Sequence, residues 1–133
     1  MAIANQSNFL RKVLFADAAI SGTTGLVMLL FADSLNQLLG VPVGLLRYAG
    51  LSLLPFAALL IYLATRQHLQ RPIIWAIISG NALWAIDSIL LLFTNWVAPT
   101  ALGYGFIIAQ AMLVAVFAEA QYFGLKKSLP VGN

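Results

Sequence analysis

Three carboxylates lie inside apolar segments of the chain: Asp17 in "VLFADAAISG", Asp87 in "NALWAIDS" and Glu119 in "VAVFAEAQ". Charged side chains at membrane depth are costly. Those that occur usually face a bundle interior or a water-filled cavity, where they bind ions or carry protons. These three residues are therefore the first candidates for chemistry.

Asp17 and Glu119 are expected at a similar depth, near the side of the membrane that holds both chain termini. Two carboxylates at one depth could share a proton or hold a cation. The favoured interpretation is structural. In it, Asp17 accepts hydrogen bonds inside the bundle, and Glu119 reaches the interface beside Lys126 or Lys127.

The last apolar segment carries polar residues on opposite faces. At about 100° per residue, Glu119 points about 180° away from Gln110. Both side chains cannot face the interior of one four-helix bundle. Either one of them contacts a second subunit, which predicts a homo-oligomer or a larger membrane complex, or Glu119 lies at headgroup level.

Asp87 has two interpretations. The first is an ion pair with Arg47 that holds two halves of the bundle together; breaking a buried pair costs about 3–5 kcal/mol. The second is a proton carrier. On a helix, Asn81 lies about 120° from Asp87 with Trp84 midway between them, so the stretch presents a wide surface.

The candidates for a ligand site or proton pathway are Asp17, Asn81, Trp84, Asp87, Gln110 and Glu119.

The composition predicts the elements that position these residues. The chain is 62% hydrophobic and 8% charged, whereas soluble domains carry about 25% charged residues. A membrane-spanning helix needs about 20 apolar residues. We therefore predict an all-α integral membrane protein, a single domain whose four-helix bundle crosses the lipid bilayer at residues 13–31, 45–65, 73–93 and 102–123. A cleaved signal peptide is the disfavoured alternative for the first span, because Asp17 and nearby hydroxyl residues interrupt it.

The basic residues predict the orientation, because Lys and Arg favour cytoplasmic loops. Only Arg47 falls on one side of the four-span arrangement. The basic residues of the other side are Arg11, Lys12, Arg66, Arg71, Lys126 and Lys127. This distribution predicts cytoplasmic N- and C-termini. Because the basic residues are spread in small groups, the net charge of +3 does not indicate a nucleic-acid partner.

A faint internal repeat joins the two halves of the chain. The string "ISG" occurs at residues 20–22 and 78–80, and Pro42 and Pro99 lie at a nearly equal offset. These matches indicate either chance or two parallel helical hairpins related by an axis along the membrane normal.

Motifs for catalysis and cofactor binding are missing from the sequence. It contains no GxGxxG, Walker A or HExxH pattern, no Cys and one His. We therefore expect no enzymatic activity, no metal site and no cofactor.

The layout is similar to that of many small four-helix proteins of the bacterial cytoplasmic membrane. Small multidrug-resistance transporters share the size, the four spans and an acidic residue in the first span. Their acidic residue is a glutamate in a context that "FADAAISG" does not reproduce, so the resemblance covers the layout alone. The first functional expectation is a structural or accessory subunit of a membrane assembly. The alternative is a small proton-coupled transporter, or a binder of a lipophilic ligand, that uses the intramembrane acidic residues.

Overall fold

The computed structural model describes residues 3–130. Four helices in this range are long and apolar enough to span a membrane, which confirms the predicted number of long apolar helices. They are α1 (Asn8–Leu30), α3 (Val43–Thr65), α4 (Arg71–Leu91) and α5 (Ala101–Lys127). The remaining elements are a short helix, α2 (Ala32–Leu39), and three short strands, β1 (Ile3–Asn5), β2 (His68–Gln70) and β3 (Leu129–Pro130).

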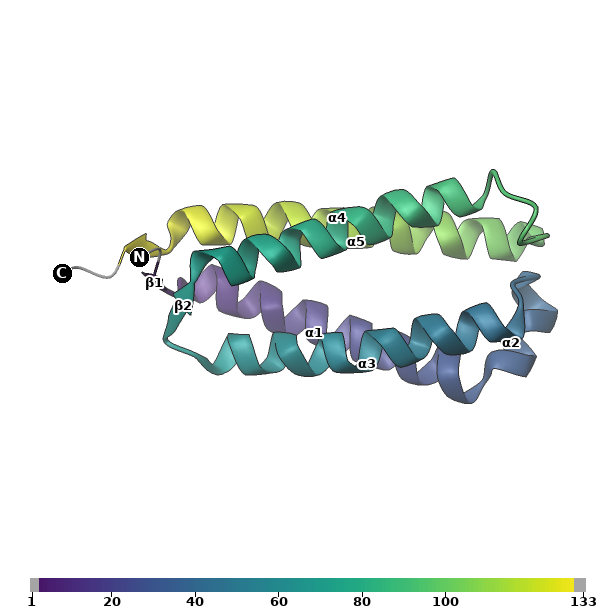
Figure 1. Ribbon diagram of the computed structural model, residues 1–133, viewed down its shortest axis with the longest axis horizontal. Helices are drawn as coiled ribbons and strands as arrows, with labels where there is room; N and C mark the ends of the chain where they lie inside the picture. Colours follow the sequence, from purple (N-terminus) through teal and green to yellow (C-terminus); the bar gives the residue numbers. More distant parts are fainter. Residues whose placement is uncertain (1–2, 131–133) are drawn as a thin grey trace.

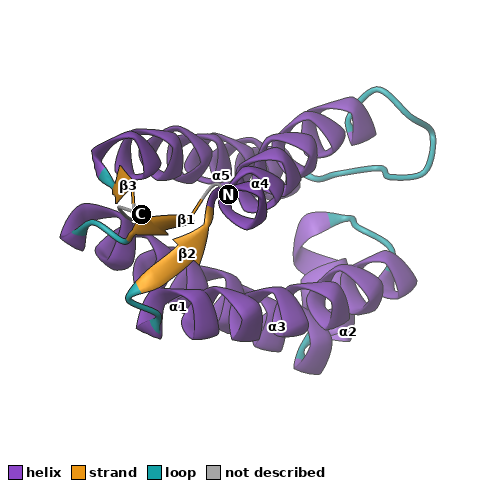
Figure 2. Ribbon diagram, turned by 60° about the vertical axis from the view of Figure 1, so that its left-hand side comes forward, coloured by secondary structure: helices purple, strands orange, loops and turns teal. Residues whose placement is uncertain are grey.

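Two helical hairpins form the body of the molecule (Figure 1). α1 packs along α3, and α4 packs along α5. The hairpins contact each other mainly through α1 and α5. Their long helices lie close together at the end that carries both termini and diverge toward the other end (Figures 1 and 2), where α2 contacts α5.

The close approach of α1 and α3 depends on two glycines. A Cβ atom on Gly50 would lie 2.6 Å from the carbonyl oxygen of Gly25, and one on Gly25 would lie 2.9 Å from Cβ of Leu53. Any larger residue would therefore push the backbones apart. In lipid, such small residues allow the tight packing that drives helix association, because lipid tails supply little hydrophobic force between helices.

The apolar core is divided into two clusters along the bundle. One cluster lies at the end with the termini and joins both hairpins through residues that include Leu14, Leu60, Ile74 and Leu125. The other lies toward α2, and its fully buried members come mainly from the first hairpin and the connections. The long helices of the two hairpins are therefore packed together at the end with the termini. At the other end α2 contacts the start of α5, where the backbone amide of Thr100 donates to the carbonyl oxygen of Leu39 across 3.0 Å.

The connection after α1 contains a helix that the sequence did not predict. α2 buries Ala32 and Leu39 and ends at Gly40, whose φ of 73° is left-handed and favours glycine. The amide of Asn36 donates to the carbonyl oxygen of Val41 across 2.7 Å. A helix of 8 residues is too short to stand out in a search for segments of about 20 apolar residues.

A small sheet closes the end of the molecule where the termini lie (Figure 2). β1 pairs with β2 on one side and with β3 on the other, both antiparallel. The sheet therefore joins the N-terminal segment, the α3–α4 connection and the segment after α5. Strands of two or three residues show no alternating pattern in sequence, so this sheet is a correction to the purely helical prediction.

Long polar side chains satisfy helix carbonyls at this same end. Nε2 of Gln6 donates to the carbonyl oxygens of Leu63 and Arg66, and Nη1 of Arg11 donates to that of Ala64 across 2.8 Å. Nη2 of Arg71 donates to the carbonyl oxygen of Ser128 across 2.8 Å. The last carbonyls of a helix have no partner within it, so these contacts stabilise the closed end.

Candidate functional site

A buried polar cluster joins the two hairpins about halfway along the bundle. Oδ2 of Asp17 on α1 accepts hydrogen bonds from Nδ2 of Asn81 on α4, at 2.9 Å, and from Nε2 of Gln121 on α5, at 2.6 Å. Oδ1 accepts from the hydroxyl of Ser21, one turn further along α1, at 2.9 Å. Asp17, Asn81 and Gln121 are 1%, 4% and 0% exposed, so the whole cluster is shielded from lipid and water.

The cluster is arranged around the carboxylate of Asp17. Each of its three neighbours donates to one of its two oxygens. Nδ2 of Asn81 also donates to Oε1 of Gln121 at 2.9 Å, so the two amides orient each other. These contacts therefore suit a structural role in which the cluster holds α1, α4 and α5 together.

The structure adds Gln121 and Ser21 to the candidate residues, and the sequence contains a signal for both. Ser21 lies four residues after Asp17, on the same face of α1. Gln121 lies six residues before the end of α5 and Asp17 nine residues after the start of α1. At about 1.5 Å per residue, these positions are at neighbouring depths.

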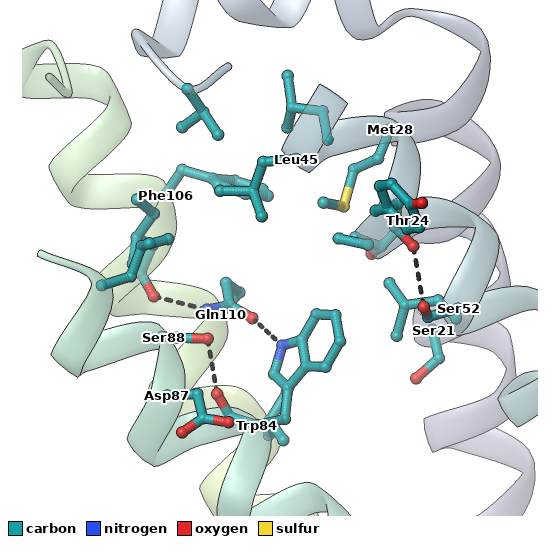
Figure 3. A pocket seen from close by; sticks show the side chains of 18 of the residues that line it. Ser21, Thr24, Met28, Leu45, Ser52, Trp84, Asp87, Ser88, Phe106 and Gln110 are labelled. Carbon is teal, nitrogen blue, oxygen red and sulfur yellow. Dashed lines mark hydrogen bonds between the residues drawn. The ribbon is translucent and has the colours of Figure 1, made fainter. Parts of the chain in front are cut away.

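A cavity of about 850 Å³ lies between the hairpins, in the half of the molecule away from the termini (Figure 3). The second half of α1 and the first half of α3 form one wall, and the second half of α4 and the first half of α5 form the other. Ser21 lines this cavity and also donates to Asp17. The polar cluster therefore lies just beneath the cavity floor.

The cavity wall is mainly apolar. Its apolar members include Met28, Leu45, Leu53 and Phe106, and its polar members include Ser21, Thr24, Tyr48, Ser52, Trp84, Asp87, Ser88 and Gln110. Such a wall, apolar with a few polar groups, is typical of small-molecule sites.

Trp84 and Gln110 lie together in this wall, as Figure 3 shows. Nε1 of the Trp84 indole donates to Oε1 of Gln110 across 2.9 Å, and Nε2 of Gln110 donates to the carbonyl oxygen of Ile107. The hydroxyl of Ser88 donates to the carbonyl oxygen of Trp84 across 2.7 Å. The bond to Gln110, whose own amide is anchored on Ile107, holds the indole ring at a defined position against the cavity.

Asp87 and Arg47 do not meet in the described part of the chain. Arg47 lies instead beside Asp33 of α2, with Nη2 and Oδ2 3.6 Å apart and both side chains largely exposed. The predicted ion pair is thus replaced by a surface pair, because α2 presents a carboxylate on the same side of the molecule as the start of α3. Asp87 is exposed at the cavity edge, and its carboxylate has no ion-pair or hydrogen-bond partner within residues 3–130.

Glu119 lies apart from the buried cluster. It is exposed and borders a shallow hollow formed with residues such as Trp75 and Tyr122. The hydrogen-bond partners of Asp17 come from Ser21, Asn81 and Gln121, and Glu119 is not among them. The structure therefore does not bring the two carboxylates together to share a proton.

The two lysines expected near Glu119 lie over aromatic rings. Nζ of Lys126 is 5.4 Å from the ring centroid of Tyr122, and Nζ of Lys127 is 4.7 Å from that of Phe9.

Within residues 3–130, no group of three or more His, Cys, Asp or Glu residues could hold a metal ion.

Comparisons of the chain with protein-family models, with curated proteins and with solved structures found no match. The cavity and its polar groups are therefore the features of the chain that bear on its function.

Proposed function

We propose that the chain binds a lipophilic ligand within the bilayer, in the cavity between the two hairpins. The observation that carries this proposal is the cavity itself: about 850 Å³ of space with a mainly apolar wall. Sites for small molecules typically measure about 300–1,000 Å³ and are lined by apolar and aromatic side chains with a few polar groups.

The carboxylates of Asp17 and Asp87 differ in their hydrogen-bond partners, and this difference favours ligand binding over a purely structural role. Asp17 accepts hydrogen bonds from three donors and holds the helices together below the cavity. Asp87, at the cavity edge, has no partner within the described residues. A mainly apolar space of this size, with a carboxylate at its edge that has no partner within the described residues, is typical of a ligand site.

The proposed orientation places both termini in the cytoplasm, in a bacterial cytoplasmic membrane. Its support is the concentration of basic residues at the closed end of the bundle, together with the preference of Lys and Arg for cytoplasmic loops. In this orientation the cavity lies in the non-cytoplasmic half. The α1–α3 and α4–α5 hairpins are then the two units of the proposed parallel repeat.

A cavity-filling substitution tests the proposal. Ala49 lines the cavity, whereas Ala58, nine residues later on α3, is exposed and does not. The protein in phosphatidylcholine nanodiscs would be photolabelled with a neutral hydrocarbon that bears a diazirine group, with and without an excess of the same hydrocarbon lacking the diazirine. Labelled peptides would be identified by mass spectrometry.

We expect saturable labelling of peptides that line the cavity, and non-saturable labelling of the lipid-facing surface. Ala49→Trp should abolish the saturable part, and Ala58→Trp should preserve it. Circular dichroism would show that both variants keep their helices. Saturable labelling that Ala49→Trp leaves unchanged would count against the cavity as the binding site.

A further inference from the structure

We infer that the ligand of this cavity is a lipophilic cation, whose charge lies beside Asp87 and whose apolar body fills the space between the hairpins. This inference rests on the proposed function, since it names the class of ligand for the same cavity. It begins from the charge of the wall. Among the described residues that line the cavity, Asp87 is the one charged side chain, and no Lys, Arg or His accompanies it.

The position of Asp87 along α4 suits the headgroup of an amphiphile. It lies four residues before the end of α4 at Leu91, which is about 6 Å at 1.5 Å per residue. A charged group at this depth remains near the membrane surface, where charged side chains are least costly. The apolar wall extends from there toward the middle of the bilayer, at the depth where an apolar body is stable.

Asp87 is free to bind a cation without a competing interaction inside the chain. Arg47, the basic residue expected nearby, lies 3.6 Å from Asp33 instead. The carboxylate is exposed and makes no side-chain hydrogen bond within residues 3–130. A cationic ligand would thus gain an ion pair without breaking one.

Aromatic rings in the same wall provide a second attraction for a cation. Trp84 precedes Asp87 by three residues, which places the two side chains on neighbouring positions of the helix surface. The hydrogen bond from its indole nitrogen to Gln110 holds the ring in place (Figure 3). The faces of Trp and Tyr rings attract cations, and the attraction is stronger where water is excluded. Tyr48 and Trp96 also line the cavity.

Two ions of the same shape and opposite charge test this inference: tetraphenylphosphonium and tetraphenylborate. Each would compete with the neutral diazirine hydrocarbon for saturable labelling in phosphatidylcholine nanodiscs. Each ion is compared between variants in the same lipid, so its partitioning into the bilayer cancels. The variants are Asp87→Asn, Asp87→Glu and Glu119→Gln, the last of which removes the same charge from a surface outside the cavity.

Asp87→Asn should weaken competition by tetraphenylphosphonium by up to about fivefold, the change that corresponds to the loss of one ion pair with an exposed carboxylate. Competition by tetraphenylborate should stay equal or become stronger, and labelling by the neutral probe should not change. Asp87→Glu should retain most of the cation binding, and Glu119→Gln should retain all of it.

The two failures are distinguishable. If the neutral probe labels the cavity saturably while Asp87→Asn leaves tetraphenylphosphonium unaffected, or if Glu119→Gln has the same effect as Asp87→Asn, the inference of a cationic ligand is wrong and the lipophilic site remains. If the neutral probe shows no saturable labelling in the unmodified protein, the proposed function and this inference are both wrong.

Discussion

The side-chain amide of Asn81 donates to the carboxylate of Asp17 across 2.9 Å, which connects residues 64 positions apart in the sequence. The same amide nitrogen donates to Gln121 on α5. One side chain of the second hairpin thereby holds α1 in register with both helices of that hairpin. The contact closes the floor of the cavity, and the more open half of the molecule begins beyond it.

The first prediction concerns the carboxylate of this cluster. Asp17→Leu should lower the free energy of unfolding by several kcal/mol, because two buried amides lose an acceptor at about 1–3 kcal/mol for each group. Asp17→Asn should cost much less. Its carbonyl oxygen can still accept from both amides, and the Ser21 hydroxyl can turn to accept from its NH2 group. Urea unfolding in mixed micelles, followed by circular dichroism, would measure the difference.

A triple variant distinguishes two contributions to the free energy of unfolding: the stabilisation that the complete cluster provides, and the cost of leaving hydrogen-bond donors unpaired. Replacing Asp17, Asn81 and Gln121 together by Leu should cost less than three times the Asp17→Leu change, since no polar group then remains unsatisfied. An additive loss across the three substitutions would mean that the side chains act independently.

The second prediction concerns the contact of α1 with α3. Gly50→Ala should destabilise the protein by about 1–3 kcal/mol, the usual cost of overpacking a tight interface, because its Cβ atom would lie 2.6 Å from the Gly25 carbonyl oxygen. Gly44→Ala is the matched control on the same helix, as nothing lies within 4 Å of its added Cβ atom. Thermal unfolding of both variants in one detergent would compare them. Equal melting temperatures would contradict the close approach.

The third prediction follows from the placement of Arg47. An exposed ion pair contributes about 0–1 kcal/mol, and the side chains of Arg47 and Asp33 are 55% and 80% exposed. Arg47→Ala should therefore leave the yield of folded protein nearly unchanged, and so should Asp87→Ala. Size-exclusion chromatography with fluorescence detection would measure these yields. Strong loss with Asp87→Ala, partly recovered in the Arg47→Ala/Asp87→Ala variant, would favour the ion pair that the structure does not contain.

The fourth prediction concerns the exposed carboxylate of α5. Glu119 is exposed on the bundle surface and lies within the predicted span 102–123. A charge there is costly, and contact with a second copy of the chain would shield it. The chain contains no cysteine, so a single Ala115→Cys substitution one turn before Glu119 provides a specific crosslinking site. Oxidation in native membranes should trap a dimer. An Ala58→Cys variant, on the outer surface of α3, should remain monomeric. Persistent monomer with Ala115→Cys would exclude contact along this face.

The sequence was sufficient to predict the four long apolar helices, because composition and the length of an apolar segment are local properties. The structure gives α1, α3, α4 and α5 close to the predicted spans, with boundaries that differ by a few residues. The short elements were missed. α2 lacks the length, and the three strands lack the repeating pattern, on which such predictions depend.

Helical periodicity also placed Asn81 and Asp87 on different faces of one helix, and in the structure Asn81 is buried while Asp87 is exposed. What periodicity could not decide is which face of each helix meets which neighbour. That depends on how the helices rotate and cross, and here the glycine contact between α1 and α3 and the terminal sheet impose the arrangement. Only the tertiary structure therefore brings Gln121 to Asp17, turns Arg47 toward Asp33 and leaves a cavity beside Asp87. Each of these relationships depends on how separate helices are placed relative to one another, and the residues of one helix alone do not determine it.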